Sequence, residues 1–469
     1  MAIRRSAFVA ALVLAAISTA AFAQPQRNGP LPQPLPLFPP DNWWNVDVSA
    51  APVAGNSTAL LNATIASNVG LHPDFGGDAP DFPEIYGMPY VSVAGSQPLQ
   101  PITWVEFGNQ SDPGVPGRPP GYPVPEEAKT QAKWIEGGYP GNVDPGGDRH
   151  LLIVDRDNRI LYELYRAFWN AGLGRWEASS GAIFSLDGNN RRPETWTSAD
   201  AAGLAILPGL VRYDEAFGTD PIRHAFRVTV HPTTGYVYPA SHNATTGANA
   251  LPLGARLRLK ANVNPTIPGD ATAAEAAAIQ RIAQAMKTYG LVVADNGSDL
   301  YVQGTYDTRW NNDVLNPAFA SLHRDDFEVI QLGWRPVETS APSLAFHTLV
   351  PCRVLDTRDP FGPWGAPPLF PGWHRVIRIT GRCGIPAAAK AVSINVTVAG
   401  STAGGYLTFF PGNADGGATS TVHFAAGQIR GNNAVLMLAS SGTGTLAVHH
   451  TSASAGLVHL IVDVNGYFQ

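Results

Sequence analysis

Charge and long hydrophobic runs are both scarce in this sequence. Asp, Glu, Lys and Arg make up 14% of the 469 residues, and 31 basic against 37 acidic side chains leave a formal net charge of −6. Because nucleic-acid binding calls for clustered positive charge, we expect no nucleic-acid partner. Beyond residues 1–23, no apolar stretch approaches the roughly 20 residues that a membrane span needs, so we expect no membrane partner.

Several motifs that carry common chemistries are also missing. The sequence has no HExxH zinc motif, no GxSxG nucleophile elbow and no glycine-rich phosphate loop. Their absence argues against a zinc peptidase, an α/β-hydrolase and an enzyme that acts on nucleotides. We therefore expect no cofactor.

The N-terminus has the pattern of a secretory signal peptide. Arg4 and Arg5 precede an apolar run, which ends in Ala21-Phe22-Ala23 at a typical cleavage site. The run is too short to span a membrane, and no cysteine follows it to accept a lipid. We expect residues 1–23 to be removed and the mature protein to be secreted, either extracellular or periplasmic.

Cysteine is almost absent, since the chain has only Cys352 and Cys383. In an exported protein an even number of cysteines favours a disulfide, so we predict that these two are bonded to each other. The larger N-terminal part has no cysteine and must be held together by its core.

Glycine and proline, by contrast, are abundant, with 48 and 41 residues. Frequent turns and sparse charge are typical of extracellular all-β proteins with long loops. Short segments that alternate apolar and polar residues recur, and one helix is predicted over 271–288 with Gly290 at its end. The predicted fold class is mainly β: a β-sandwich or jelly-roll-like main domain with one packed helix, followed by a smaller C-terminal β-sandwich.

Composition divides the chain into five segments. Repeated prolines, which lack the N–H group and fix φ, predict an extended leader after the signal peptide. A long Pro/Gly-rich loop over 111–147 is predicted to be a packed flap, since loops of that length are usually functional or disordered. The predicted segments are the signal peptide (1–23), the leader (24–40), the main, catalytic domain (41–332), a linker (333–343) and the C-terminal accessory domain (344–469).

The C-terminal segment carries a series of recognisable motifs. VPCRVLDTR, GRCGIP, AVSINVTV, GYLTFFPG, GQIRGNNAV and HLIVDVNGYF follow one another in this order. Together they resemble the β-sandwich module at the C-termini of many secreted bacterial enzymes and surface proteins. The resemblance implies an accessory role, attachment or polymer binding, with no chemistry of its own.

The main domain resembles an uncharacterised family of secreted proteins from soil actinobacteria and proteobacteria. The resemblance rests on the motifs DNWWN, LHPDFG, GDRHLLIVDRD, LYEL, WTSADAAGL, ILPGLVRYDE, YVYPASH, RLRLKA and YGLVVADNGSD. It carries over no catalytic residues. Tyr238 stands in YVYPASH where the family pattern has Trp.

The stretch 195–215 is predicted to be a shaped loop on the surface of the main domain. It combines turn residues, apolar residues and carboxylates, and the predicted strands around it carry further polar side chains. A glycosidase needs two carboxylates about 5 to 10 Å apart across a cleft. The candidate catalytic residues are Glu163, Asp200, Asp214 and Glu215.

Each of these carboxylates also has a structural interpretation. A buried Glu163 must be paired with an Arg or a His unless it lines a cleft, because an unpaired buried charge is very costly. Asp200 is equally compatible with a helical turn capped by Ser198, and Asp214 and Glu215 with solvated turns.

Aromatic and histidine side chains complete the candidate site. Stacking on sugar rings needs exposed aromatics, although a single aromatic residue is more often part of the core. The candidate substrate-binding residues are Trp169, Trp176, Trp196, Tyr238, His150 and His242. In a rival interpretation Asp148, His150, His224 and His242 converge on a metal ion, but their spacing is not diagnostic and we assign no metal ligand.

These observations lead to a ranked set of functional predictions. The first is a secreted, polysaccharide-directed hydrolase, a glycoside hydrolase that uses two carboxylates and acts as a monomer on an extracellular polysaccharide. The second is a non-catalytic extracellular protein that binds polysaccharide or mediates adhesion. The third is a metal-dependent enzyme that uses the histidines.

Overall fold

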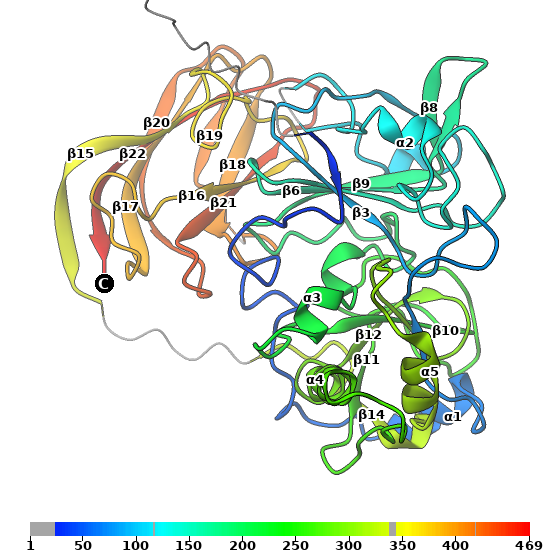
Figure 1. Cartoon of the computed structure of the whole chain (residues 1–469). Coiled ribbons are helices and arrows are strands. Elements are labelled where there is room, and N and C mark those ends of the chain that lie inside the picture. The colour runs from blue at the N-terminus through cyan, green and yellow to red at the C-terminus, as the bar shows by residue number, and fades with distance from the viewer. Residues whose placement is uncertain (1–23, 116–117, 337–343, 418) are drawn as a thin grey trace, which may run out of the picture.

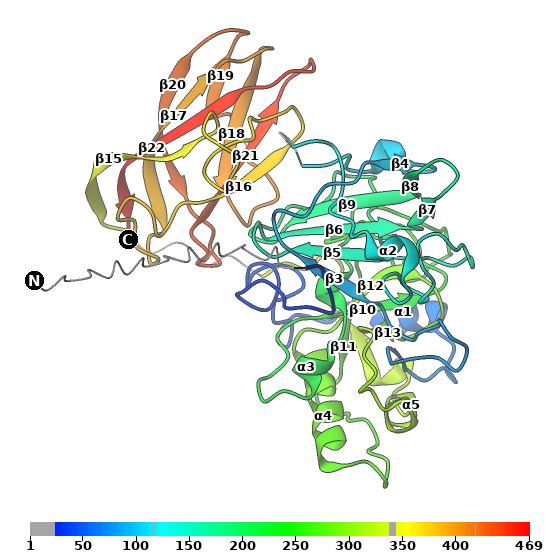
Figure 2. The same ribbon diagram turned by 45° about the horizontal axis from the view of Figure 1, so that its top comes forward.

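The computed structural model describes residues 24–115, 118–336, 344–417 and 419–469. The predicted signal peptide and most of the predicted linker therefore lie outside the described residues. Figures 1 and 2 show a main body and, beside it, a C-terminal β-sandwich. The mainly β fold class predicted from the sequence is confirmed.

A five-stranded sheet forms one half of the main body. Its strands are, in spatial order, β1 (Gln26–Arg27), β3 (Tyr90–Val93), β5 (Leu151–Asp155), β6 (Ile160–Tyr165) and β9 (Ser180–Ser185). A small sheet of β4 (Ile102–Trp104), β8 (Arg175–Ala178) and β7 (Phe168–Asn170) shares a hydrophobic core with it. Tyr122, Tyr162 and Trp176 lie at the centre of this core and are almost completely buried.

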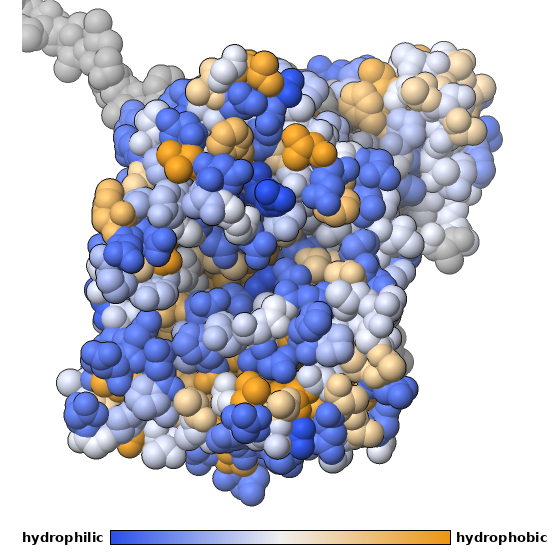
Figure 3. Space-filling view, turned by 90° about the vertical axis from the view of Figure 1, so that its right-hand side faces the viewer, coloured by the Kyte–Doolittle hydropathy of each residue, from blue (hydrophilic) through white to orange (hydrophobic). Residues whose placement is uncertain are grey.

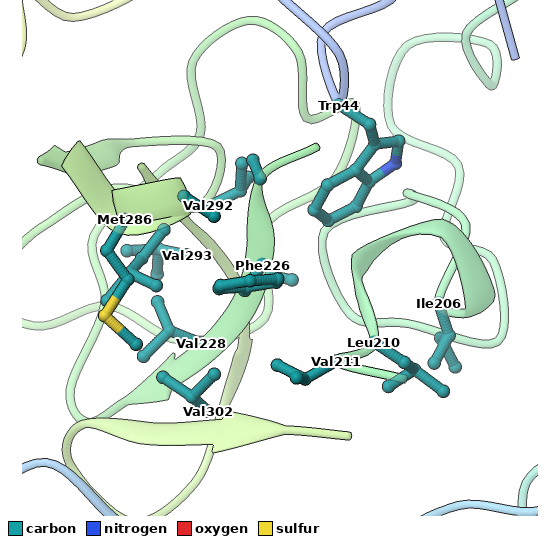
Figure 4. Packing of buried hydrophobic residues seen from close by; sticks show 14 of the residues in the cluster. Trp44, Ile206, Leu210, Val211, Phe226, Val228, Met286, Val292, Val293 and Val302 are labelled. Atoms are coloured by element: carbon teal, nitrogen blue, oxygen red, sulfur yellow. The ribbon is translucent and has the colours of Figure 1, made fainter. Parts of the chain in front are cut away.

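A six-stranded sheet forms the other half. Its strands are, in order, β14 (Phe327–Val329), β11 (Arg256–Leu259), β12 (Leu291–Asn296), β10 (Phe226–Val230), β13 (Tyr301–Gln303) and β2 (His72–Asp74). Strands β10 and β12 are parallel, so their carboxyl ends meet at one edge of the sheet. Phe226, Val228 and Val230 are buried in the main hydrophobic core, which Figure 4 shows around Phe226.

The predicted helix is present as α4 (Ala273–Thr288). Thr272 and Glu275 form a capping box at its start, which satisfies two backbone N–H groups. Gly290 follows its end with φ at +77°, the left-handed conformation that glycine adopts at least cost. Met286 from this helix packs close to Val228 and Val293 of the sheet (Figure 4).

The other helical segments are short. They are α1 (Ser57–Thr64), α2 (Glu127–Thr130), α3 (Tyr213–Ala216), α5 (Asn312–Ala320), and the 3₁₀ turns η1 (Gly108–Gln110), η2 (Leu207–Gly209) and η3 (Arg324–Asp326). Among the described residues, no helix has the length and apolar character that a membrane crossing requires.

The proline-rich stretch 24–40 is part of the main body. Strand β1 pairs with β3, and Leu37 and Phe38 are buried in the main core. The Asn45 amide donates hydrogen bonds to the carbonyls of Leu37 (2.8 Å), Phe38 (3.2 Å) and Pro39 (2.9 Å). Prolines remove backbone donors, and this side chain binds the carbonyls that remain, so the proline-rich stretch is packed on the main body.

The C-terminal part is a β-sandwich of two four-stranded sheets. The first is β15 (Phe346–Asp356), β22 (His459–Phe468), β17 (Ala391–Ala399) and β20 (Arg430–Met437). The second is β16 (His374–Arg378), β21 (Thr445–Thr451), β18 (Gly405–Pro411) and β19 (Val422–Phe424). The predicted disulfide between Cys352 and Cys383 is confirmed, with their Cα atoms 5.9 Å apart.

Polar side chains form part of the contact between the two parts. The Asn189 amide donates to Asp41 Oδ1 (3.1 Å) and to the carbonyl oxygen of Asn413 (3.2 Å). Ser440 Oγ donates to Asp41 Oδ2 (3.3 Å). Arg335, at the start of the predicted linker, pairs with Asp415 at 2.7 Å.

Candidate active site

A row of polar residues crosses three neighbouring strands of the six-stranded sheet. Gln303 on β13 is aligned with Asp74 on β2, and Val302 is aligned with Val228 on β10. Continuing this register places Arg227 opposite Gln303. The Gln303 amide lies 3.4 Å from Asp74 Oδ2.

Arg227 is the centre of a buried network of ion pairs. Its guanidinium donates two parallel hydrogen bonds to Asp200, Nε to Oδ2 and Nη2 to Oδ1, both at 2.8 Å. The same Nη2 donates to Asp295 Oδ2 at 3.0 Å. Asp200 is fully buried and Arg227 nearly so, whereas the Asp295 side chain is 22% exposed. The arginine therefore links a structural carboxylate in the interior to one at the surface.

His150 and Glu136 form a second pair beside the first. His150 Nδ1 lies 2.6 Å from Glu136 Oε2, and Nε2 lies 2.9 Å from the carbonyl oxygen of Ala199. Both ring nitrogens face acceptors, so both must carry a proton. Burial opposes the positive charge, but the Glu136 carboxylate outweighs it and raises the pKa of His150 to about 9. Because Ala199 precedes Asp200, the two networks share one loop.

Asp295 and Glu136, which are both partly exposed, have pKa values shifted in opposite directions. Burial and the negative charge of Asp200 raise the pKa of Asp295 to about 7, in spite of Arg227. Burial acts in the same direction on Glu136, but protonated His150 outweighs it and lowers the Glu136 pKa. At neutral pH Glu136 is therefore ionised, while Asp295 is protonated in part of the molecules. The Glu136 side chain is 23% exposed, so both groups are accessible from solvent.

One polar atom near these carboxylates lacks a partner. Gln303, which is aligned with Asp74, is 4% exposed, and its Oε1 has no hydrogen-bond partner among the described residues. The face of the molecule in Figure 3 has a shallow hollow with hydrophilic residues around it. Unsatisfied groups beside partly exposed carboxylates are typical of a binding site for a polar ligand.

Glu163, the leading candidate from the sequence, has a different role. Its fully buried carboxylate accepts hydrogen bonds from the backbone N–H groups of Ile206 (2.8 Å) and Leu207 (2.9 Å). The predicted alternatives were an ion pair or a cleft, and both are wrong, because the partners are the N–H groups at the start of η2. Glu163 thus holds in place the loop that carries Asp200.

The environment of Glu163 leads to a prediction about stability. Burial, only partly offset by the backbone hydrogen bonds, raises the pKa of Glu163 from 4.5 to about 7. The folded state then binds a proton more tightly than the unfolded state. The resulting stabilisation is complete below pH 4.5 and is lost as pH rises to about 7, a change of about 3 kcal/mol. Urea unfolding of the Glu163→Gln variant across this pH range should show a smaller loss than the unchanged chain.

Glu215→Gln is the matched control for this measurement. The pKa of Glu215 is lowered, since Arg212 and His224 outweigh the effect of burial. Its contribution is lost as pH falls, so this substitution should leave the loss between pH 4.5 and 7 in place. An unchanged pH profile in Glu163→Gln would contradict the assignment.

Asp214 and Glu215 belong to another cluster. The Asp214 side chain is 85% exposed and pairs with Arg309 at 2.8 Å. Glu215 caps α3 and accepts a hydrogen bond from His224 Nε2 at 2.9 Å. Of the four predicted catalytic residues, Asp200 and Glu163 are close enough for one charge to shift the pKa of the other.

The rival metal site is not formed. Among the described residues, no three His, Cys, Asp or Glu side chains are placed to hold a metal ion. His150 binds Glu136, His224 binds Glu215, and His242 Nδ1 lies 2.9 Å from the carbonyl oxygen of Ala201. The described histidines therefore do not converge with Asp148 as the rival interpretation requires.

The predicted aromatic platform is dispersed. Trp176 is a core residue, 1% exposed, with Trp169 packed against it at 5.7 Å between ring centroids. Trp169 and Trp196 are half-buried and covered by the cations of Lys129 and Arg192. Tyr238 lines a separate cavity. Tyr165, whose ring lies 5.6 Å from that of His150, is an aromatic neighbour of the Glu136–His150 pair.

Sequence reasoning missed Glu136, Asp295, Asp74 and Arg227. Signals for three of them were present: Asp295 ends a predicted strand, Asp74 lies in the LHPDFG motif, and Glu136 lies in the long predicted flap. A comparison with known protein-family models finds no match. The curated proteins contain no significant match either.

Proposed function

We propose that this protein is a secreted glycoside hydrolase that acts on a polysaccharide, with Asp295 and Glu136 as its two carboxylates. The observation that carries the proposal is the pair of partly exposed carboxyl groups with opposite pKa shifts. Hydrolysis of a glycosidic bond needs one protonated and one ionised carboxyl group at neutral pH.

The surrounding residues give the two carboxyl groups different catalytic roles. Asp295, protonated in part of the molecules near pH 7, is the general acid that protonates the leaving oxygen. Glu136 stays ionised beside His150 and is the second carboxylate, acting on water or on the sugar itself. Arg227 and His150 are positioning residues, since each holds one of the two carboxylates through a hydrogen bond.

Two further observations support a polymeric, extracellular substrate. The predicted signal peptide directs the chain out of the cytoplasm. The resemblance of the main domain to secreted bacterial proteins, and of the C-terminal sandwich to accessory modules of secreted enzymes, supports action on a polymer outside the cell. We propose that the protein works as a monomer.

The test is release of new reducing ends from a panel of polysaccharides. The purified chain should release them from at least one polymer in the panel, and Asp295→Asn should not. Binding to a polymer without release of reducing ends, in both proteins, would instead favour the non-catalytic polysaccharide-binding alternative.

A further inference from the structure

A small cavity lies beside the contact between the main body and the C-terminal sandwich. Its volume is about 30 Å³, and its lining includes Asp41, Trp43, Tyr238, Arg256 and Trp334. About 10 to 15 Å³ is enough for one water molecule, so the cavity has room for a compact ion or a single functional group but not for a sugar ring.

Arg256 is a buried cation without an ion-pair partner among the described residues. It is 6% exposed, and its guanidinium donates to the backbone carbonyls of Trp43 and Tyr289. Arg258, two residues along the same strand, pairs with Glu328 at 2.7 Å. Burial without a carboxylate lowers the pKa of Arg256 to about 10. A buried charge of this kind is costly unless a counter-ion is bound.

Two further donors line the cavity without a protein partner. Trp43 is 4% exposed, and its indole Nε1 has no acceptor among the described residues. The Tyr238 hydroxyl makes no hydrogen bond within the described part of the chain, although its ring contacts the guanidinium of Arg335 at 3.7 Å. The cavity lining thus contains two donors without a protein acceptor, the Trp43 indole and the Tyr238 hydroxyl, and one cation without a carboxylate partner, Arg256. Such a set of groups is suited to an anion.

The one carboxylate in the lining is already satisfied. Asp41 accepts hydrogen bonds from the side chains of Asn189, Asn413 and Ser440. Burial also raises its pKa, which favours its neutral form. Asp41 therefore does not compete with a bound anion for the Arg256 guanidinium.

We propose that the cavity lined by Trp43, Tyr238 and Arg256 binds a compact monovalent anion, either a halide or the carboxylate group of a small organic acid. The anion accepts hydrogen bonds from the indole, the hydroxyl and the guanidinium, and it compensates the buried charge. Trp334 lines the cavity, and Arg335 contacts the ring of Tyr238. The bound anion therefore also stabilises the start of the segment that leads to the C-terminal sandwich.

Thermal unfolding in mixed sodium salts at constant ionic strength tests the proposal. Sodium sulfate maintains the ionic strength, and chloride or acetate replaces it stepwise. Removal of sulfate lowers the stability of any protein gradually. Against that gradual effect, a saturable rise in unfolding temperature should appear with chloride, acetate or both, and the active salt identifies the source of the anion. Absence of a saturable component with both salts would overturn the proposal.

Variants separate this site from a general salt effect. Tyr238→Phe removes one donor that no described residue uses, so the chain should fold, and the half-saturating concentration should rise about tenfold. Arg256→Gln should abolish the saturable part. Tyr139→Phe, at a half-buried tyrosine outside the cavity, should behave like the unchanged chain. Identical salt dependence in Tyr238→Phe and Tyr139→Phe would contradict the site.

Discussion

Replacing Asp295 with Asn should lower kcat by about 100-fold to 10,000-fold on the polysaccharide that the chain hydrolyses, because that is the usual contribution of general acid catalysis. The amide keeps the size of the side chain and one acceptor for Arg227, so folding should be preserved. KM should change little, since proton donation is needed in the transition state and not for binding. Steady-state kinetics on purified variants measures both constants.

The pH profile adds a readout that a structural role would not affect. With a pKa of about 7, Asp295 loses its proton as pH rises, so kcat/KM of the unchanged chain should fall above neutral pH. The Asp295→Asn variant should lose this limb of the profile, and Glu136→Gln should lose activity over the whole range.

Asp214→Asn is the matched control for the catalytic assignment. Asp214 is a carboxylate of the same type, but it is 85% exposed and pairs only with Arg309. Its substitution should leave kcat and KM unchanged. Full activity in Asp295→Asn, or equal losses in the two variants, would contradict the role of Asp295.

The parts of the fold that depend on local pattern could be predicted from the sequence. Two cysteines in one exported module indicate one disulfide, and the helical spacing of apolar residues before Gly290 indicates α4. The buried alternation of Val392, Ile394 and Val396 on β17 has the same basis. Parallel pairing, such as β10 with β12, depends on chain segments far apart and leaves no comparable local signal.

The candidate site was predicted only in part, for the same reason. Asp200 was predicted because of its loop, and that loop does lie beside the site. Both oxygens of the Asp200 carboxylate, however, accept hydrogen bonds from Arg227. Arg227 stood in the apolar strand FRVTV, where a buried cation requires a carboxylate partner. Glu136 and Asp295 are 159 positions apart, and only the folded chain brings their networks together through residues 199 and 200.

The buried ion pair should also dominate the stability of the main body. Arg227→Met should reduce the free energy of unfolding by about 3 to 5 kcal/mol, because it leaves the fully buried Asp200 without a counter-charge. Asp295 would lose its partner as well, and the loop that Asp200 anchors would be released. Urea unfolding followed by tryptophan fluorescence measures the change, since most tryptophans lie in the main body.

Two further variants distinguish a buried charge from a lost contact. Arg309→Met removes an exposed arginine, 53% accessible, from its pairs with Asp214 and Asp307, and should cost at most about 1 kcal/mol.

In the double variant Arg227→Met with Asp200→Asn, the unpaired charge is gone, so part of the lost stability should return. The contrary outcome is that Asp200→Asn lowers the stability of the Arg227→Met variant by as much as it lowers that of the unchanged chain. The loss of stability in Arg227→Met then does not come from an uncompensated Asp200. Arg227 would then stabilise the main body through packing of its side chain, and the electrostatic link from Asp200 to Asp295 would have to be abandoned.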